Sequence, residues 1–272
     1  MICFPNCKIN LGLFITHRRA DGYHDLETVF LPVTKAILPT APQAQGAEIA
    51  TVLNDVLEVV PALSTSKMHL SGRAVGGNAD DNLVWKAYKM LQSDFGDRIP
   101  ALDIFLHKAI PMGAGLGGGS ADGAFMLTLL NEYCQLGLSA LQLGAYALRL
   151  GSDCPFFIYN TPQFATGRGE IMQAIDVDLT GYELRIICPE IHVSTRDAFA
   201  LIQPRPAPFD LRNIGKIPVS DWKNVVSNDF EGPVFNKHPE LAQIKKQFYE
   251  DGALYAAMSG TGSAVYGIFS RA

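Results

Sequence analysis

The segment from Pro111 to Ala121 carries five glycines among its eleven residues. Glycine lets backbone N–H groups approach a ligand closely and adopts conformations that other residues avoid. The segment leads into a predicted helix, whose free N–H groups and positive dipole end favour an anion. A flexible connection is the alternative, but so much glycine costs backbone entropy without a gain in packing. We therefore predict a phosphate-binding loop that comprises Pro111, Met112, Gly113, Ala114, Gly115, Leu116, Gly117, Gly118, Gly119, Ser120 and Ala121.

The loop departs from well-known phosphate-binding patterns. Gly113, Gly115 and Gly118 have the spacing of the dinucleotide fingerprint, but the surrounding strand–helix–strand unit with its later acidic residue is not apparent. A Walker loop requires a lysine before its Ser or Thr, whereas Gly119 precedes Ser120 here. The catalytic-loop sequence of protein kinases is also missing. The loop alone therefore predicts a phosphate site of another kind.

Three further positions carry side chains that could do chemistry. Lys8, amid apolar neighbours, could orient a hydroxyl or offset phosphate charge, although a lysine at a strand edge is the commoner explanation. Tyr23 and His24 follow a turn and offer an aromatic face and a hydrogen-bonding ring, although ordinary surface is the commoner explanation for such a pair. Asp153 lies between a predicted helix end and a proline, where a carboxylate either forms a turn or acts as a positioned base.

The composition excludes several classes of protein. Apolar residues make up 48% of the chain and charged residues 18%, which is typical of a globular protein with a substantial core. The net charge of −5 argues against a nucleic-acid surface, whose affinity depends on Lys and Arg. No apolar run is long enough to span a membrane, and Lys8 within the apolar N-terminus argues against a signal peptide. The five cysteines are irregularly spaced and form no CxxC pair, which predicts reduced thiols in a cytoplasmic protein.

Hydrophobic periodicity predicts strands and helices that do not strictly alternate, which indicates an α+β fold. Ser139 and Gln142 form a capping box that opens one helix, and Pro239 opens another that ends before Gly252. A boundary near residue 160 would divide the chain into two lobes. The predicted helices cover 83–95, 121–134, 139–151 and 239–251. The predicted strands cover 9–16, 26–33, 56–60, 67–70, 102–106, 184–188, 254–259 and 264–269.

Several segments, taken in order, resemble those of the GHMP kinases, and the resemblance covers nearly the whole chain. It implies a two-lobed α+β fold with the active site in the cleft between the lobes. The expected lobes are residues 1–160, similar to ribosomal protein S5, and residues 161–272, a ferredoxin-like α/β sandwich. The segments that carry the resemblance are Pro5–Leu11, Arg19–His24, Pro111–Ala121, Gly151–Phe157, Asn228–Glu231 and Ser259–Ser263.

Two motifs resemble one branch of this superfamily. Asp-Gly-Tyr-His and Gly-Ser-Asp-Cys-Pro-Phe-Phe are similar to those of members that use ATP and Mg²⁺ to phosphorylate the 2-hydroxyl of 4-diphosphocytidyl-2-C-methyl-D-erythritol, in the non-mevalonate isoprenoid pathway. The resemblance implies that Lys8 and Asp153 form the catalytic pair and that Ser120 lies beside the metal. It also implies a set of binding residues. These are Asn10, Tyr23, His24 and Phe199 for the substrate, Asn82 and Lys108 beside the nucleotide, and Gly260, Thr261 and Gly262 in support of the phosphate loop.

Two features depart from the family pattern. Residues 36–55 resemble an insertion between strands that the family joins more directly. The chain also ends at Ala272, soon after its last predicted strand, where family members carry a further helix and strand. We therefore expect either an incomplete last sheet or a sequence that is shortened at this end.

Two alternative functions stay open. The first is another GHMP kinase for a small alcohol, of the mevalonate or homoserine type, although Tyr23, His24 and Phe199 favour a cytosine base. The second is a non-catalytic nucleotide-binding protein on the same fold, against which Lys8 and Asp153 argue. For the predicted kinase we expect a monomer or a homodimer that binds ATP and a cytidine diphosphate sugar alcohol rather than nucleic acid or membrane.

Overall fold

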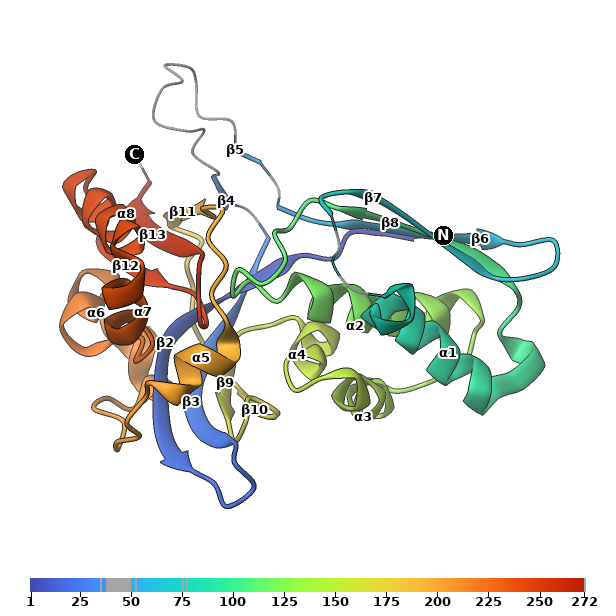
Figure 1. Ribbon diagram of the computed structural model, residues 1–272, viewed down its shortest axis with the longest axis horizontal. Coiled ribbons are helices and arrows are strands. Elements are labelled where there is room, and N and C mark those ends of the chain that lie inside the picture. Colours follow the sequence, from blue (N-terminus) through green and yellow to red (C-terminus); the bar gives the residue numbers. More distant parts are fainter. Residues whose placement is uncertain (35, 38–49, 52, 75, 77, 272) are drawn as a thin grey trace. The chain divides into compact units, whose positions relative to one another are not determined.

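The computed structural model describes residues 1–272 except 35, 38–49, 52, 75, 77 and 272 (Figure 1). Most of the insertion expected at 36–55 therefore lies outside the described residues. Two short strands of that segment are described, β4 (Ala36–Ile37) and β5 (Ala50–Thr51), and they pair in antiparallel fashion. Among the helices that the structure describes, none has the length and apolar character needed to cross a membrane.

The chain forms two compact units that are not two consecutive halves. The first unit contains Met1–Cys7, Leu53–Met112 and Gly117–Thr161. The second unit contains Lys8–Val52, Gly113–Leu116 and Pro162–Ala272. The division expected at residue 160 is therefore one of several points where the chain passes from one unit to the other.

The first unit packs helices against one face of a four-stranded sheet with the order β1-β6-β8-β7 (Figure 1). Alternate residues of one central strand, Leu102, Ile104, Leu106 and Lys108, are buried, as expected for a strand with one covered face. The strands are β1 (Ile2–Cys3), β6 (Val56–Pro61), β7 (Lys67–Gly72) and β8 (Leu102–Lys108). The helices are α1 (Leu83–Phe95), α2 (Gly118–Tyr133), α3 (Ala140–Leu150) and α4 (Cys154–Tyr159), and short 3₁₀ turns cover 79–81 and 96–98.

Local capping sets where these helices begin. The bounds of α1 are as predicted, and Asn82 caps it by accepting a backbone N–H of the first turn at 2.9 Å. Ser139 and Gln142 form the predicted capping box of α3. The predicted start of α2 is wrong by three residues, since the helix begins at Gly118. The reason is that Gly117 adopts the left-handed conformation (φ 71°) and turns the glycine loop directly into the helix.

The tripeptide Asp94-Phe95-Gly96 has the sequence with which protein kinases hold magnesium, and sequence reasoning missed it. Here it ends α1, where Gly96 is the C-cap with a φ of 55°. Asp94 accepts a hydrogen bond from the Tyr146 hydroxyl at 2.8 Å and pairs with Arg149 at 3.5 Å. The tripeptide is therefore a helix end rather than a kinase metal motif.

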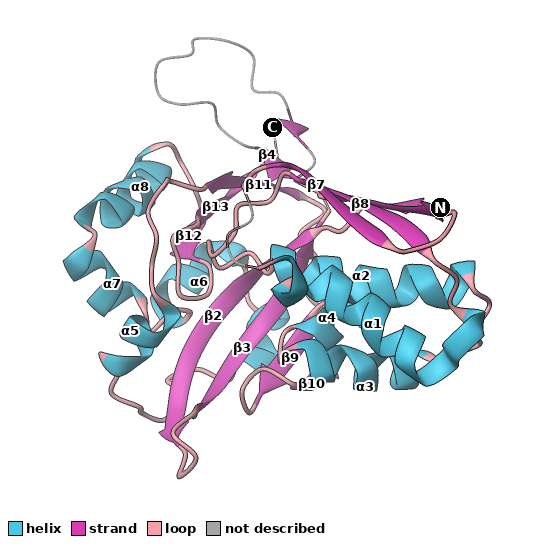
Figure 2. Ribbon diagram, turned by 45° about the vertical axis from the view of Figure 1, so that its right-hand side comes forward, coloured by secondary structure: helices cyan, strands magenta, loops and turns pink. Residues whose placement is uncertain are grey.

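The second unit contains two sheets (Figure 2). One sheet has the order β10-β9-β3-β2 and rests on two long strands, β2 (Cys7–Arg18) and β3 (His24–Val33). A hairpin of β9 (Gln163–Thr166) and β10 (Ile171–Ala174) extends it. The other sheet has the order β12-β13-β11-β4-β5, and its longer strands are β11 (Tyr182–Ile187), β12 (Tyr255–Met258) and β13 (Val265–Ser270).

Three short helices of the second unit have no counterpart in the sequence predictions. They are α5 (Thr195–Ala200), α6 (Val219–Val225) and α7 (Glu231–Lys237), whereas the longer α8 (Pro239–Glu250) confirms the predicted helix. A helix of six or seven residues is too short to show a helical period in its sequence. Tertiary packing fixes these elements instead. Helices α5 and α7 join a core that includes Ala198, Phe230, Val234, Leu241, Phe248 and Met258, and α6 buries Val219 and Trp222. A 3₁₀ helix at Leu211–Lys216 completes this part of the chain.

Candidate active site

Lys8 and Asn10 lie on the buried part of β2, and Lys8 contacts the glycine loop. They are two residues apart, so the alternation of a strand places them on the same face. The Lys8 ammonium donates to Asn10 Oδ1 at 2.6 Å and to the Gly115 carbonyl oxygen at 3.1 Å. Each side chain is only 3% exposed, and a buried charge requires partners of this kind. The charge of Lys8 is therefore held against the backbone of the predicted phosphate loop.

The segment between β12 and β13 supports the middle of the same loop. Ser259 Oγ donates to the Gly115 carbonyl oxygen at 2.9 Å, and the Ala264 N–H donates to the Ala114 carbonyl oxygen at 3.0 Å. Gly115 has a φ of 78°, and a Cβ added there would lie 2.0 Å from the Ser259 carbonyl oxygen. Position 115 therefore accepts only glycine. The supporting segment contains the three residues assigned to this role from the sequence, Gly260, Thr261 and Gly262.

Three residues that sequence reasoning did not assign hold this arrangement together. Asn228 Nδ2 donates to the carbonyl oxygens of Met258 and Gly260, each at 2.8 Å. Asn10 Nδ2 donates to Thr28 Oγ1 at 2.9 Å, and the Tyr266 hydroxyl donates to the Asn10 carbonyl oxygen at 2.7 Å. Asn228 belongs to a motif that contributed to the family resemblance. Thr28 and Tyr266 lie in ordinary strands, where nothing in the local sequence marks them.

The helix end of the loop belongs to the first unit. A Cβ at Gly118 would lie 2.7 Å from Ile110 Cγ2, so the start of α2 packs tightly on the strand end that precedes the loop. The Ser120 side chain is hydrogen-bonded to the Cys154 thiol, and burial raises the pKa of Cys154 to about 12. The Ser120 hydroxyl opposes this rise in pKa, so in this hydrogen bond it donates to the Cys154 sulfur. Since the first backbone N–H groups of a helix have no acceptor within it, they are available to phosphate oxygens.

A buried ion cluster connects the residues before the loop to the helix after it. The Lys108 ammonium pairs with Asp55 and with Asp122 of α2, the latter at 2.6 Å. Asp55 Oδ1 accepts the N–H groups of Ala109 and Ile110 at 2.6 and 2.9 Å. None of the three charged side chains is more than 4% exposed. The cluster therefore connects the two segments of the first unit that lie before and after the loop.

Lys108 is more deeply buried than a nucleotide contact would require. Its side chain is 1% exposed and engaged by two carboxylates, so a direct contact with the nucleotide stays a prediction. The alternation of Leu102, Ile104 and Leu106 was a signal for this burial, because it continues to position 108. Burial raises the pKa of Asp122 to about 8; the Lys108 ammonium opposes this shift and the neighbouring carboxylate adds to it.

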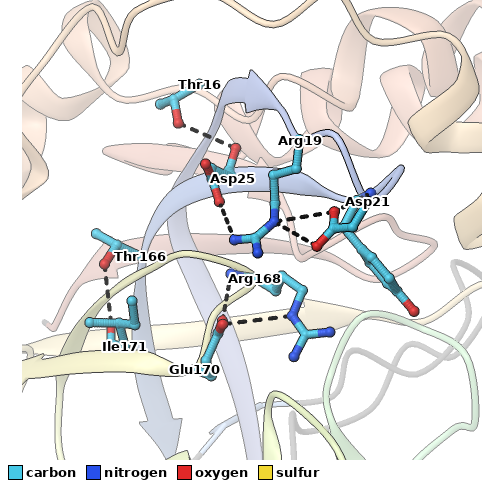
Figure 3. Close-up of polar contacts among 9 residues, drawn as sticks. Thr16, Arg19, Asp21, Asp25, Thr166, Arg168, Glu170 and Ile171 are labelled. Carbon is cyan, nitrogen blue, oxygen red and sulfur yellow. Dashed lines mark hydrogen bonds and ion pairs between the residues drawn. The ribbon is translucent and has the colours of Figure 1, made fainter.

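The turn after β2 presents Tyr23 and is stiffened by Arg19. The Arg19 guanidinium contacts Asp21 at 3.1 Å and Asp25 at 3.0 Å (Figure 3). The Tyr23 N–H donates to Asp21 Oδ1 at 3.1 Å. This hydrogen bond, and after it the Arg19 guanidinium, lower the pKa of Asp21. The Tyr23 side chain itself is exposed, so its ring is accessible to a ligand.

His24 of β3 and Phe199 of α5 lie together in the second unit. Their ring centroids are 5.2 Å apart with an interplanar angle of 28°, and Phe199 meets Phe230 edge-on at 4.8 Å. Burial, and after it the charge of Arg18, lowers the pKa of His24. The imidazole is therefore neutral at pH 7 and offers one N–H donor and one acceptor. Such a ring can form hydrogen bonds with the edge of a base.

The other assigned residues of the first unit lie at helix starts. Asp153 is half-buried and directly precedes α4, but its side chain does not cap that helix. Asn82 is the N-cap of α1, which gives it a structural role beside the predicted nucleotide contact. The described residues contain no group of three or more His, Cys, Asp or Glu side chains that could hold a metal ion. Magnesium in kinases is held largely by substrate phosphates and water, so the protein needs to supply few ligands. The Ser120 oxygen at the start of α2 is of the right chemical type to be one of them.

Comparison with known proteins shows to which family this chain belongs. Models of the GHMP kinase N-terminal and C-terminal domains match residues 82–161 and 208–272. The 4-diphosphocytidyl-2-C-methyl-D-erythritol kinase of Bacteroides fragilis is 50% identical over 270 residues, which cover 99% of this chain and 92% of the relative. The enzyme of the same name from Bacteroides thetaiotaomicron is 48% identical, with coverages of 99% and 92%. A crystal structure of 4-(cytidine 5'-diphospho)-2C-methyl-D-erythritol kinase is 30% identical, covers 98% of this chain and 90% of its own, and has a TM-score of 0.75. The chain therefore belongs to the GHMP kinases and has their two-lobed α+β fold.

Proposed function

We propose that this chain transfers the γ-phosphoryl group of ATP to the 2-hydroxyl of 4-diphosphocytidyl-2-C-methyl-D-erythritol. Relatives that share 48 to 50% of its residues over nearly its whole length are named as kinases of this compound. The observation that carries the proposal is the contact of the buried Lys8 ammonium with the Gly115 carbonyl oxygen, because it ties a cation to the loop that would hold ATP. The products are ADP and the phosphate ester of the 2-hydroxyl.

Lys8 and Asp153 divide the work of the transfer in this proposal. Asp153 aligns the 2-hydroxyl and accepts its proton as the hydroxyl oxygen attacks the γ-phosphorus and the bond to the β-phosphate oxygen breaks. Lys8 stabilises the negative charge on the transferred group. Phosphoryl transfer depends mainly on positioning and electrostatics, so one carboxylate and one ammonium are sufficient side-chain chemistry.

The cytidine part of the substrate accounts for the aromatic residues. Tyr23 and Phe199 supply ring faces for the base, His24 binds its edge, and Asn10 contacts the substrate near Lys8. His24 covers a face of Phe199 in the structure. Stacked rings lie about 3.5–4 Å apart, so a base between His24 and Phe199 would need their centroids to be about 7 Å apart. The centroids are 5.2 Å apart, so the His24 ring has to move before a base can stack on the face of Phe199 that it covers.

Magnesium enters this proposal as an ion on the phosphate oxygens of ATP. When bound, it neutralises charge on the β- and γ-phosphates. The Ser120 hydroxyl would contact it, and the backbone N–H groups at the start of α2 would bind phosphate oxygens directly. A cytoplasmic location, and a monomeric or homodimeric state, stay predictions from the sequence.

A coupled assay that records ADP formation tests the proposal. We expect turnover with the diphosphocytidyl alcohol and much slower turnover with mevalonate or homoserine. Asp153→Asn should still bind ATP but lose at least about 100-fold in kcat, the usual effect of removing a group that handles the proton. Asp251→Asn, which changes an exposed carboxylate after α8, is the matched control. Faster turnover of another alcohol would refute the substrate, and an unchanged kcat in Asp153→Asn would remove Asp153 from the mechanism.

A further inference from the structure

We propose that Arg168 is a positioning residue for substrate recognition: its guanidinium packs on one face of Tyr23 and holds that ring ready to stack on the cytosine base. The inference rests on the proposed function, because Tyr23 has a base to stack on only if the acceptor carries cytidine. The sequence around Arg168 indicates no more than a hairpin turn between two glycines.

Hydrogen bonds between two hairpins bring Arg168 beside Tyr23. β3 and β9 pair as antiparallel strands, and their ladder continues past the end of β9. The Leu26 N–H donates to the Gly167 carbonyl oxygen at 2.7 Å. Tyr23 lies three residues before Leu26, and Arg168 directly follows Gly167. The backbone pairing register therefore places both residues at the same end of the sheet, independently of any side-chain contact.

The turn between β9 and β10 fixes the direction of the Arg168 side chain. Gly167 and Gly169, on either side of it, have φ angles of 68° and 106°, which side-chain-bearing residues rarely adopt. Glu170 Oε2 accepts the Arg168 backbone N–H at 2.5 Å, and Glu170 Oε1 lies 3.6 Å from Arg168 Nε (Figure 3). One carboxylate therefore holds both the backbone and the guanidinium of Arg168.

The guanidinium carbon of Arg168 lies 5.1 Å from the centroid of the Tyr23 ring. That distance is within the range of about 6 Å over which a cation and an aromatic face attract each other. The backbone of Tyr23 is already fixed, since its N–H donates to Asp21 and its carbonyl oxygen accepts the Arg19 N–H at 2.8 Å. The side-chain torsions of Tyr23 are the remaining freedom, and the contact with Arg168 restricts them.

The ring keeps enough open surface to bind a ligand. Tyr23 is 57% exposed despite the guanidinium on one face. Ordering a side chain before binding reduces the entropy lost when the ligand arrives, which lowers KM without altering the chemical step. Arg168 should therefore affect the KM of the cytidylyl alcohol and leave both kcat and the KM of ATP unchanged.

A double-mutant cycle between Arg168 and Tyr23 tests this inference with the full-length protein. Arg168→Ala should raise the KM of the diphosphocytidyl alcohol about 2- to 5-fold, as expected for an exposed cation–π contact. In a Tyr23→Ala background the same change should have no further effect, because the ring on which Arg168 acts is gone. An effect of equal size in both backgrounds, or in neither, would refute the positioning role.

Two further variants separate stacking from charge and from general effects of removing an arginine. Arg168→Lys keeps the charge but lacks the planar group, so we expect less than half of the lost affinity to return; complete recovery would overturn the stacking argument. Arg149→Ala is the matched control, since Arg149 lies 5.3 Å from the Tyr146 ring on α3 and should leave KM unchanged. If the wild type does not phosphorylate the cytidylyl alcohol at all, the proposed function fails before any variant is compared.

Discussion

Replacing Asp122 with asparagine should leave the protein folded and make it more stable than the wild type as the pH rises. Asp122 shares the Lys108 ammonium with Asp55 in a cluster that is almost completely buried. Burial raises the pKa of Asp122 to about 8, against its ordinary value of 3.8. Near neutral pH the carboxyl therefore holds a proton, and a neutral amide of the same shape reproduces that state.

The expected pH dependence follows from the direction of the shift. Because the folded-state pKa is raised, the stability that this proton contributes is complete below pH 3.8 and is lost as the pH rises through 8. If Asp122 titrated independently of its neighbours, the free energy of unfolding of the wild type would fall by about 1.4 kcal/mol per pH unit within this window. Since the Lys108 charge favours the ionised form of Asp122, we expect a smaller change, on the order of 2 kcal/mol between pH 5 and pH 8. Asp122→Asn carries no such proton and should lack this slope.

Urea unfolding at pH 5, 6, 7 and 8, without ATP or magnesium, measures the effect, and Trp85 on α1 reports on the first unit. Lys108→Met sets the opposite extreme, because it leaves two buried carboxyls without their cation and should cost about 3–5 kcal/mol. Asp81→Asn removes an exposed carboxylate of the same unit and is the matched control. A free-energy difference between wild type and Asp122→Asn that is constant from pH 5 to pH 8 would refute the reasoning.

Three further predictions concern the support of the site. Gly115→Ala should raise the KM of ATP several-fold or more in the kinase assay, because its Cβ would lie 2.0 Å from the Ser259 carbonyl oxygen and its φ is positive; an unchanged KM would contradict this packing. Asn82→Ala should lower the free energy of unfolding by about 1 kcal/mol in urea titrations, the usual value of a lost N-cap, and Asn82→Asp should restore most of it. Asn228→Ala leaves two buried carbonyl oxygens without their donor and should cost about 1–3 kcal/mol, with faster hydrogen exchange at 259–263 as the second readout.

Long, regular elements could be predicted from the sequence because their patterns are local. The helix at 83–95 and the capping box of α3 needed only neighbouring residues, and the long strands β2 and β3 were recognised within a few residues of their ends. The short helices α5, α6 and α7 could not be predicted, since the packing of their buried side chains rather than periodicity holds them. The early start of α2 was missed for a related reason, because a glycine run has no side-chain pattern to show where helical geometry begins.

The glycine loop and the order of the motifs are properties of the sequence alone, and they were sufficient to predict a phosphate site and a GHMP kinase. Glycine spacing is a local signal, and its meaning does not depend on what packs around it. Only the tertiary structure decided what surrounds the loop. Lys8 and Ser259 donate to the Gly115 carbonyl oxygen, and two buried carboxylates pair with Lys108. It also decided that Arg168 contacts Tyr23, although the two residues are far apart in the sequence. Such contacts depend on strand register and burial, which connect residues far apart in the chain and leave no local pattern in the sequence.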